Sequence, residues 1–278
     1  MTNKKMIVMD LDGTLVRSKN GKSLNTSKES IKYLNKLKED GYIIVIATGR
    51  NLKNSLLGTD GAEFANYIIT NTGAVIFKRD NFEVIRKKTI DNQSLRKFIS
   101  FFDETFEHMQ FCDDNWYYKY TYNNQKDRDV IKIIKDKDEF LDNCKDISRI
   151  GVQLKDFNDT EKWRNKFKKE FPKLTIDIMQ DSFGKRRWIE VQNGATSKAL
   201  AIKEIAKKEN IAMNDIIAFG DGPNDIEMLK ISGVGVAVEN AFDEVKKSAD
   251  YVTKSNNEDG VIYFLKKYLK NGEEDEQL

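Results

Sequence analysis

The sequence contains very few of the residues on which several kinds of functional site depend. Its 278 residues include one histidine and two cysteines. Cys112 and Cys144 are far apart and belong to no Cys-x-x-Cys motif, which excludes a cysteine-built zinc site and a secreted disulfide framework. A single histidine, His108, excludes a His-cluster metal centre and a HExxH metalloprotease. We expect His108 to be a surface or satisfied core residue, and both cysteines to serve packing.

Long apolar runs and an excess of charge of one sign are also absent. The longest apolar runs, such as Tyr42–Ala47, are far shorter than the ~20 residues that span a bilayer, and the N-terminus does not resemble a signal peptide. Lys+Arg 47 and Asp+Glu 45 give a net charge of +2, which offers no electrostatic drive toward nucleic acid. We expect a cytoplasmic protein with no nucleic-acid, membrane or obligate protein partner.

Short buried strands alternate with amphipathic helices in the first and last parts of the chain. This alternation predicts βαβ units and an α/β fold with a doubly wound, mostly parallel, Rossmann-like sheet. The expected strands are Met6–Met9, Tyr42–Ala47, Tyr67–Thr70, Ala74–Phe77, Ile216–Phe219 and Val234–Val238, and the expected helices are Ser27–Glu39, Thr196–Glu209 and Asp225–Ile231. The acidic end, Gly272–Leu278, is expected to fray.

The middle of the chain has a different pattern, with thinner apolar runs that are more aromatic. Alternating aromatic residues in Trp116–Tyr122 indicate a strand. Helical spacing is found around Leu95–Phe106 and Glu161–Phe171. We therefore expect an inserted α+β domain at residues 82–187, which divides a core formed by residues 1–81 and 188–278.

The strongest chemical signal is the pair Asp10 and Asp12, in the run Asp-Leu-Asp-Gly-Thr-Leu directly after a buried strand. Ligands bind at the carboxyl ends of strands in an open parallel sheet. Two carboxylates that converge there need a partner, and a hard divalent cation is the natural one. The alternative reading is a β-hairpin, because Asp-Gly between apolar residues is a common turn signal.

Three further motifs are expected at the same edge of the sheet. Thr48-Gly49 follows a strand and suits a phosphate, although Thr-Gly also simply ends strands. Lys198 falls in the first turn of a helix that Thr196 or Ser197 can cap, where a bound anion or plain solvation would explain a cation. The run Gly220–Asp225 places an acidic cluster, Asp221, Asn224 and Asp225, at the start of another helix, and an ordinary turn does not require all three.

Taken in order, these four motifs resemble those of the haloacid dehalogenase superfamily of phosphotransferases. The last motif, the long insertion between Thr48 and Lys198, and the chain length resemble the Cof-type branch with a C2B cap. The lead-in Ala-Thr-Ser-Lys differs slightly from the family's usual Val-Ser-Lys. The resemblance covers nearly the whole chain, although the cap matches only by position and size.

The resemblance implies a role for each residue. Asp10 would be the nucleophile that becomes an aspartyl phosphate, and Asp12 the general acid and base, with its pKa raised in the closed complex. The implied phosphate- and substrate-binding residues are Leu11, Thr48, Gly49, Lys198 and Asn224. Mg²⁺ would be held at a site formed by Asp10, Asp12 through its backbone carbonyl, Asp221 and Asp225, with Asn224 and Asp225 orienting it.

The function expected on these grounds is Mg²⁺-dependent hydrolysis of small phosphorylated metabolites, sugar phosphates above all. A phosphomannomutase-like phosphotransferase and a non-catalytic metal- or phosphate-binding protein are the alternatives. In the insertion, Arg186 and Arg187 are candidates for reaching the substrate. The aromatic stripe Trp116, Tyr118, Tyr120 and Tyr122 is expected to pack the small sheet against its helices, and stacking on a sugar ring is the other possibility.

Overall fold

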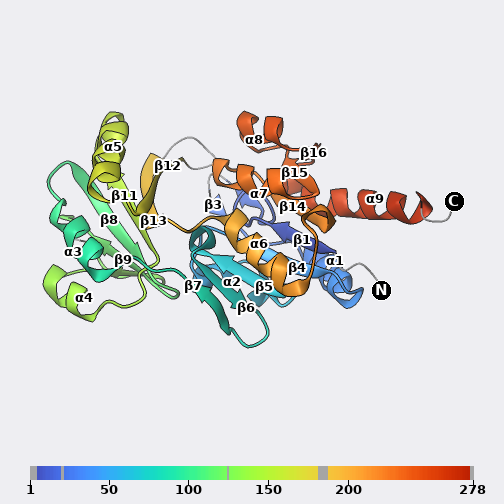
Figure 1. The fold of residues 1–278 in the computed structure, drawn as a ribbon, viewed down its shortest axis with the longest axis horizontal. Helices are drawn as coiled ribbons and strands as arrows, with labels where there is room; N and C mark the ends of the chain where they lie inside the picture. Colours follow the sequence, from blue (N-terminus) through green and yellow to red (C-terminus); the bar gives the residue numbers. More distant parts are fainter. Residues whose placement is uncertain (1–4, 20–21, 124, 181–186, 276–278) are drawn as a thin grey trace.

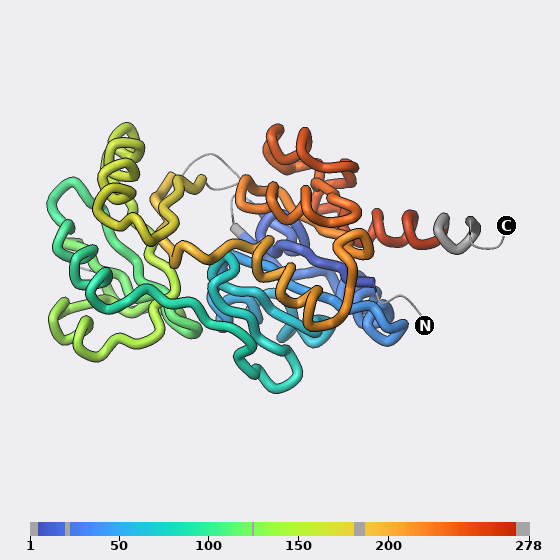
Figure 2. The backbone as a smooth tube through the Cα atoms, viewed as in Figure 1, coloured from blue at the N-terminus to red at the C-terminus, as the bar shows by residue number. Residues whose placement is uncertain are grey.

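The computed structural model describes residues 5–19, 22–123, 125–180 and 187–275. They form two units, each built on its own sheet, and the chain passes between the units twice (Figures 1 and 2). A small hairpin, β2 and β3, follows the first strand at Ser18–Lys19 and Lys22–Ser23.

The first unit is an eight-stranded sheet in the order β16-β15-β14-β1-β4-β5-β6-β7. The strands from β16 to β5 are parallel, and β6 pairs antiparallel with both β5 and β7. Their bounds are β1 Met6–Met9, β4 Ile43–Ala47, β5 Tyr67–Thr70, β6 Val75–Lys78, β7 Val84–Lys87, β14 Ile216–Gly220, β15 Val234–Val238 and β16 Tyr251–Thr253. The predicted doubly wound, mostly parallel sheet is confirmed.

Helices cover both faces of this sheet because alternate residues of its central strand point to opposite faces. Met6 and Val8 of β1 join a core cluster that contains residues of α6, α7 and α8. Ile7 and Met9 join a second cluster with residues of α1 and α9. The helices of this unit are α1 Lys28–Glu39, α2 Leu52–Leu56, α6 Lys198–Glu209, α7 Ile226–Ile231, α8 Asp243–Ser248 and α9 Gly260–Asp275. Since α9 runs to Asp275, the tail expected to fray from Gly272 is helical as far as that residue.

The second unit is a six-stranded sheet in the order β10-β9-β8-β11-β13-β12. Its strands are β8 Phe106–Cys112, β9 Tyr117–Tyr120, β10 Ile131–Ile133, β11 Arg149–Leu154, β12 Leu174–Gln180 and β13 Arg187–Asn193. Its helices, α3 Asn92–Ser100, α4 Lys137–Asn143 and α5 Thr160–Glu170, lie on the side of the sheet away from the first unit (Figure 1). Short 3-10 turns elsewhere span Asp60–Ala62, Asn71–Gly73, Phe157–Asp159, Met213–Asp215, Pro223–Asp225 and Asn256–Glu258.

The two sheets divide the chain at different points from the expected boundaries at residues 82 and 187. Strand β7 belongs to the first sheet, where Arg86 pairs with Glu204 of α6 at 3.0 Å. Strand β13 belongs to the second sheet, where Ile189 and Val191 are buried in the aromatic cluster. Both are partly polar strands, so their apolar pattern does not reveal which sheet they join. We propose an inserted domain that begins after Lys87 and ends at Asn193.

One predicted helix is longer than the observed one. The apolar spacing that suggested a helix from Leu95 to Phe106 continues past the end of α3 at Ser100. Asp103 ends it, because its carboxylate accepts hydrogen bonds from the backbone N–H and the hydroxyl of Thr105, at 2.8 and 2.6 Å. Such local bonds compete with helical ones. Phe106 therefore begins β8 instead.

The aromatic stripe is divided between two environments. Tyr120 and Tyr122 pack on Phe102, and Tyr118 packs on Phe140, as expected for a sheet against its helices. Trp116 instead lies between two ammonium groups, with Lys53 Nζ of α2 at 3.9 Å and Lys132 Nζ at 4.1 Å from its ring centroid. It is thus a contact between the two units.

His108 is half-buried on β8, and its Nδ1 has no hydrogen-bond partner in the described part of the chain. The expectation of a satisfied or surface histidine is therefore wrong. Burial, with a smaller contribution from the charge of Lys119, lowers the pKa of His108 to about 4. The folded protein consequently favours the neutral imidazole.

We predict that His108→Gln reduces the loss of stability on acidification. A folded-state pKa below the unfolded value means that stability is full above about pH 6.5 and falls as His108 is protonated between about 6.5 and 4. Urea unfolding of both proteins from pH 7.5 to 4 should show the wild type losing up to about 3 kcal/mol more than the variant. A difference between the two that is constant with pH would contradict this.

Candidate active site

The predicted motifs meet at one edge of the first sheet. Asp10 follows β1, Thr48 follows β4, Asp221 follows β14, and Lys198 begins α6. Strands β14, β1 and β4 are neighbours and parallel, so their carboxyl ends meet at the same edge. The hairpin alternative for the first motif is thereby excluded, since β1 pairs with β14 and β4.

Lys198 is the centre of this arrangement. Its side chain is 1% exposed, and Nζ lies 2.8 Å from Asp10 Oδ1 and 2.7 Å from Asp225 Oδ1. The solvated-lysine alternative is therefore wrong. Burial alone would lower the pKa of Lys198, but the charges of Asp10 and Asp225 raise it well above its usual value. Ser197 is the N-cap of α6, and its hydroxyl accepts from the Leu200 N–H at 3.1 Å.

Three buried carboxylates lie together here, and two of them bind the ammonium group of Lys198. Asp10, Asp221 and Asp225 are 7%, 2% and 0% exposed, and each offers an oxygen within 4.8 Å of the others. Burial raises the pKa of Asp10 to about 7, although Lys198 opposes the shift. Asp225 is fixed by its Oδ2, which accepts from the N–H groups of Asp221 and Gly222 at 3.1 and 3.0 Å. Three carboxyl groups and one ammonium group therefore share this buried space.

Asp12 is the one predicted catalytic carboxylate whose side chain lies outside the cluster. Arg50 binds it with two hydrogen bonds, from Nε to Oδ2 at 2.7 Å and from Nη2 to Oδ1 at 2.5 Å. The Ser23 hydroxyl of the small hairpin also donates to Oδ1. Burial raises the pKa of Asp12, but the bonds and the charge of Arg50 outweigh it, so the net pKa is below its usual value. A raised pKa in a closed complex would require Asp12 to leave Arg50.

The other predicted residues have the following places. Thr48 is buried, and its hydroxyl accepts from the Arg50 N–H at 3.1 Å. Leu11 is buried in the core, and its carbonyl accepts from the N–H groups of the turn that follows. Asn224 lines a cavity beside Lys198. Arg187 lines the same cavity and pairs with Glu161 at 3.0 Å, whereas Arg186 lies outside the described residues.

Two residues of the site were not singled out from the sequence, although both lie within the quoted motifs. Arg50 directly follows Thr48-Gly49 and is the partner of Asp12. Thr14 lies two residues after Asp12, and its hydroxyl donates to Asp221 Oδ1 at 2.8 Å. The positions of Arg50 and Thr14 within the motifs could have marked them as site residues. The motifs do not indicate where the two side chains point.

Gly13 allows the two acidic motifs to approach each other. Its φ is +79°, and a Cβ at this position would lie 2.3 Å from Asp221 Oδ2. A side chain here would meet both backbone strain and a direct clash with a buried carboxylate. Glycine is therefore required for Asp221 to lie beside the first motif.

We predict that Gly13→Ala destabilises the protein more than Gly41→Ala does. Gly41 also has a positive φ, +94°, but nothing lies within 4 Å of its added Cβ. The two variants share the strain, so the difference in urea unfolding reports the clash at Asp221, at about 1–3 kcal/mol. Equal losses would show that Asp221 moves away without cost.

We also predict that Arg50→Met raises the pKa of Asp12, because the variant removes both the hydrogen bonds and the charge that lower it. A ¹³C NMR titration of the carboxyl carbons would measure the change. Arg50→Lys is the matched control, since it keeps the charge without the paired geometry and should give a smaller rise. An unchanged titration of Asp12 in Arg50→Met would contradict the assignment of Arg50 as its partner.

Comparison with known proteins supplies independent evidence. Residues 7–265 match the family model of haloacid dehalogenase-like hydrolases. The chain is 28% identical over 268 residues to the 5-amino-6-(5-phospho-D-ribitylamino)uracil phosphatase YcsE of Bacillus subtilis, covering 95% of this chain and 96% of that protein.

Solved structures agree with this match. The phosphatase BT1666 of Bacteroides thetaiotaomicron is 26% identical, with a TM-score of 0.78 and 95% of each chain covered. The HAD subclass IIB sugar phosphatase BT4131 is 25% identical, with a TM-score of 0.77 and coverage of 95% of this chain and 99% of that one.

In the described ranges, no helix is long and apolar enough to cross a membrane.

Proposed function

The chain belongs to the haloacid dehalogenase-like hydrolase family and is a phosphatase of that family, and we propose that it hydrolyses phosphomonoesters of small metabolites through an aspartyl phosphate in a Mg²⁺-dependent reaction. The observation that carries this proposal is the buried cluster of Asp10, Asp221 and Asp225 around Lys198. An acidic cluster with one cation at the ligand-binding edge of a parallel sheet suits a phosphate that arrives with a metal ion.

Asp10 would act as the nucleophile. Its carboxylate oxygen would form a bond to phosphorus while the ester P–O bond breaks, and the electron pair would go to the leaving alcohol oxygen. Lys198, with Nζ 2.8 Å from Asp10, is close enough to offset the repulsion between this carboxylate and the phosphate. Water would then attack phosphorus, the bond to Asp10 would break, and inorganic phosphate would leave with the carboxylate restored.

Asp12 would move the protons in both steps. It would give a proton to the alcohol oxygen and later take one from the attacking water. The bonds to Arg50 keep it ionised, the form that accepts a proton from water. Its role as acid requires the protonated form, which the release of Arg50 would favour. Thr48 and the Gly49 N–H would bind the phosphoryl oxygens.

The residues present fit a magnesium ion. Asp10, Asp221 and the backbone carbonyl of Asp12 would hold it, with Asp225 and Asn224 orienting the site. Carboxylate and carbonyl oxygens are the ligands that Mg²⁺ prefers, and three buried carboxylates offer oxygens within 4.8 Å of one another. When bound, the ion supplies positive charge that holds and neutralises phosphate oxygens.

Small phosphorylated metabolites, and sugar phosphates among them, are the proposed substrates. The cavity beside Lys198 measures about 690 Å³, within the range of sites that enclose small molecules. Structural relatives include a protein named as a sugar phosphatase, and a sequence relative is named for a phosphoribitylamino compound. Both names describe substrates with a polyhydroxylated chain or ring.

We predict that Asp10→Asn abolishes phosphate release from p-nitrophenyl phosphate and sugar phosphates, by at least about 10³-fold, because the amide is not a nucleophile. EDTA should have the same effect on the wild type. Asp40→Asn, an exposed change at the end of α1, is the control and should retain full activity. Transfer of the phosphoryl group back to a hexose phosphate, instead of release as inorganic phosphate, would contradict the hydrolase and favour a phosphomutase.

A further inference from the structure

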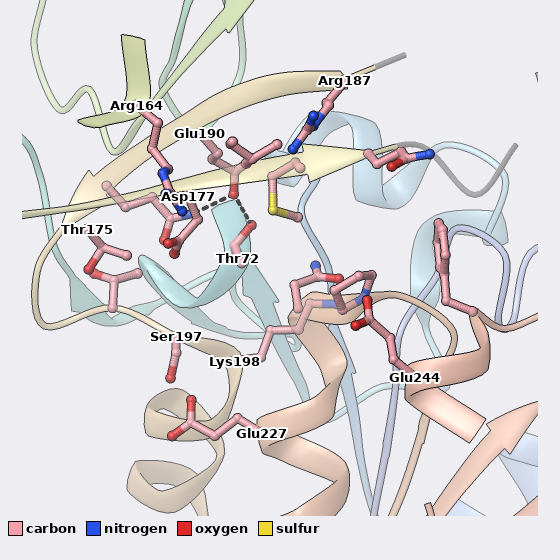
Figure 3. A pocket seen from close by; sticks show the side chains of 18 of the residues that line it. Thr72, Arg164, Thr175, Asp177, Arg187, Glu190, Ser197, Lys198, Glu227 and Glu244 are labelled. Atoms are coloured by element: carbon pink, nitrogen blue, oxygen red, sulfur yellow. Dashed lines mark hydrogen bonds between the residues drawn. The ribbon is translucent and has the colours of Figure 1, made fainter. Parts of the chain in front are cut away.

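The cavity beside Lys198 is bounded by both units of the protein. Strands β12 and β13 and helix α5 supply one side, and the first turns of α6, α7 and α8 supply the other (Figure 3). Lys198 lies at the edge of this space, so a phosphate bound at the acidic cluster would place the rest of its ester in the cavity. The lining residues therefore choose the alcohol part of the substrate.

The described lining residues are mostly polar, and one of them is aromatic. Hydroxyl and amide groups come from Thr72, Thr175, Gln180, Gln192 and Asn224, and Phe242 is the aromatic residue among the described lining residues. Thr196 also lines the cavity; it is 6% exposed, and its hydroxyl has no hydrogen-bond partner in the described ranges. This surface suits hydroxyl groups better than a nucleobase, which binds by stacking on aromatic side chains.

Carboxylates outnumber cations among the described residues that line the cavity. Glu161, Asp177, Glu190, Glu227 and Glu244 line it, against Arg164, Arg187 and Lys198. The cations are already engaged, because Glu161 pairs with Arg164 at 2.8 Å and with Arg187 at 3.0 Å, and Lys198 binds Asp10 and Asp225. Each cation of the described lining therefore has at least one carboxylate partner.

Glu227 of α7 and Glu244 of α8 are the lining carboxylates that no cation of the described residues pairs with. Both are exposed to the cavity side of the core unit (Figure 3), and neither forms an ion pair with another described residue. A second negative charge on the substrate would meet these carboxylates while losing part of its hydration. A substrate ammonium group would instead be attracted to them.

We infer that the site selects phosphomonoesters whose alcohol part is polyhydroxylated and carries no second negative charge. An amine on that part improves binding, and Glu227 and Glu244 determine this selectivity. The inference rests on the proposed function, because it places the phosphate at the acidic cluster. It separates this substrate class from bisphosphates, phosphorylated acids and nucleotides.

Three alditol derivatives that differ only at C1 test the inference. Sorbitol 6-phosphate is neutral there, 1-amino-1-deoxysorbitol 6-phosphate is cationic, and 6-phosphogluconate is anionic. We expect kcat/KM to be highest for the amine and about tenfold or more lower for the acid than for the neutral alditol. Calorimetric Kd values of the Mg²⁺-loaded Asp10→Asn variant should follow the same order, which tests selectivity without turnover.

The double variant Glu227→Gln and Glu244→Gln should reduce the ratio between the neutral and the acidic substrate by about fivefold or more, since it removes both charges at nearly constant shape. The matched control changes Glu39 and Glu63, two exposed glutamates of the core unit that do not line the cavity, to Gln. It should leave the ratio unchanged.

The outcomes separate the inference from the proposed function. Loss of p-nitrophenyl phosphate hydrolysis with the Kd order retained would overturn the phosphatase mechanism and support the inference. Turnover with 6-phosphogluconate bound as tightly as the neutral alditol would overturn the inference and leave the mechanism standing. The inference would equally fail if none of the three ligands bound, or if the double variant and its control behaved alike.

Discussion

The arrangement of the whole active site depends on the burial of one ammonium group among three carboxylates. Lys198 is 1% exposed and binds Asp10 and Asp225, which come from segments 188 and 27 residues away. Burying charges is costly unless they are paired, so the ends of β1 and β14 and the start of α6 are held at a common point. Asp221 adds a third carboxylate to the same space. Three buried carboxylates that converge on one point are a set of oxygen ligands that suits a divalent cation.

Much of the core unit could be predicted, because its strands are buried on both faces. Continuous apolar runs mark β1, β4, β5, β14 and β15, and the acidic motifs lie at the ends of two of them. The inserted unit was harder to predict. Strand β13 alternates residues buried in its own aromatic core with Glu190 and Gln192, which face the other unit, so half of its pattern reflects a contact made only in the folded protein. Strand β7 is an edge strand that is largely polar, and its place follows from the hairpin with β6 and from the contact of Arg86 with Glu204.

The motifs indicated which residues meet but not how their side chains are oriented. Asp10 and Asp12 are two residues apart, and strand spacing predicted that both point toward one spot. The chain turns immediately after Asp10, since the Leu11 carbonyl accepts from the N–H groups of Leu15 and Val16, so Asp12 leaves the strand direction and pairs with Arg50. The pKa values of Asp10 and Asp12 are therefore shifted in opposite directions, because burial raises the pKa of Asp10 and Arg50 lowers that of Asp12. Two carboxylates that are close in the sequence thus acquire different protonation behaviour from their surroundings.

The loop after β5 links the inserted unit to the same site. Asn71, Thr72 and Gly73 have φ values of 47°, 53° and 100°, a run of left-handed conformations that only strong surrounding contacts maintain. A Cβ on Gly73 would lie 2.2 Å from the Ser197 carbonyl oxygen, so this loop packs directly on the start of α6, where Lys198 is the first residue.

From the same loop, the Thr72 hydroxyl donates to Glu190 at 2.9 Å, and the Asn71 amide donates to Ser148 at 2.7 Å. Arg149 in turn binds Glu190 at 2.8 Å. The polar face of the second sheet is thereby joined, through this loop, to the helix that begins with Lys198. A displacement of that sheet would disturb the contacts of this loop first. The position of the inserted unit and the geometry around Lys198 are therefore coupled.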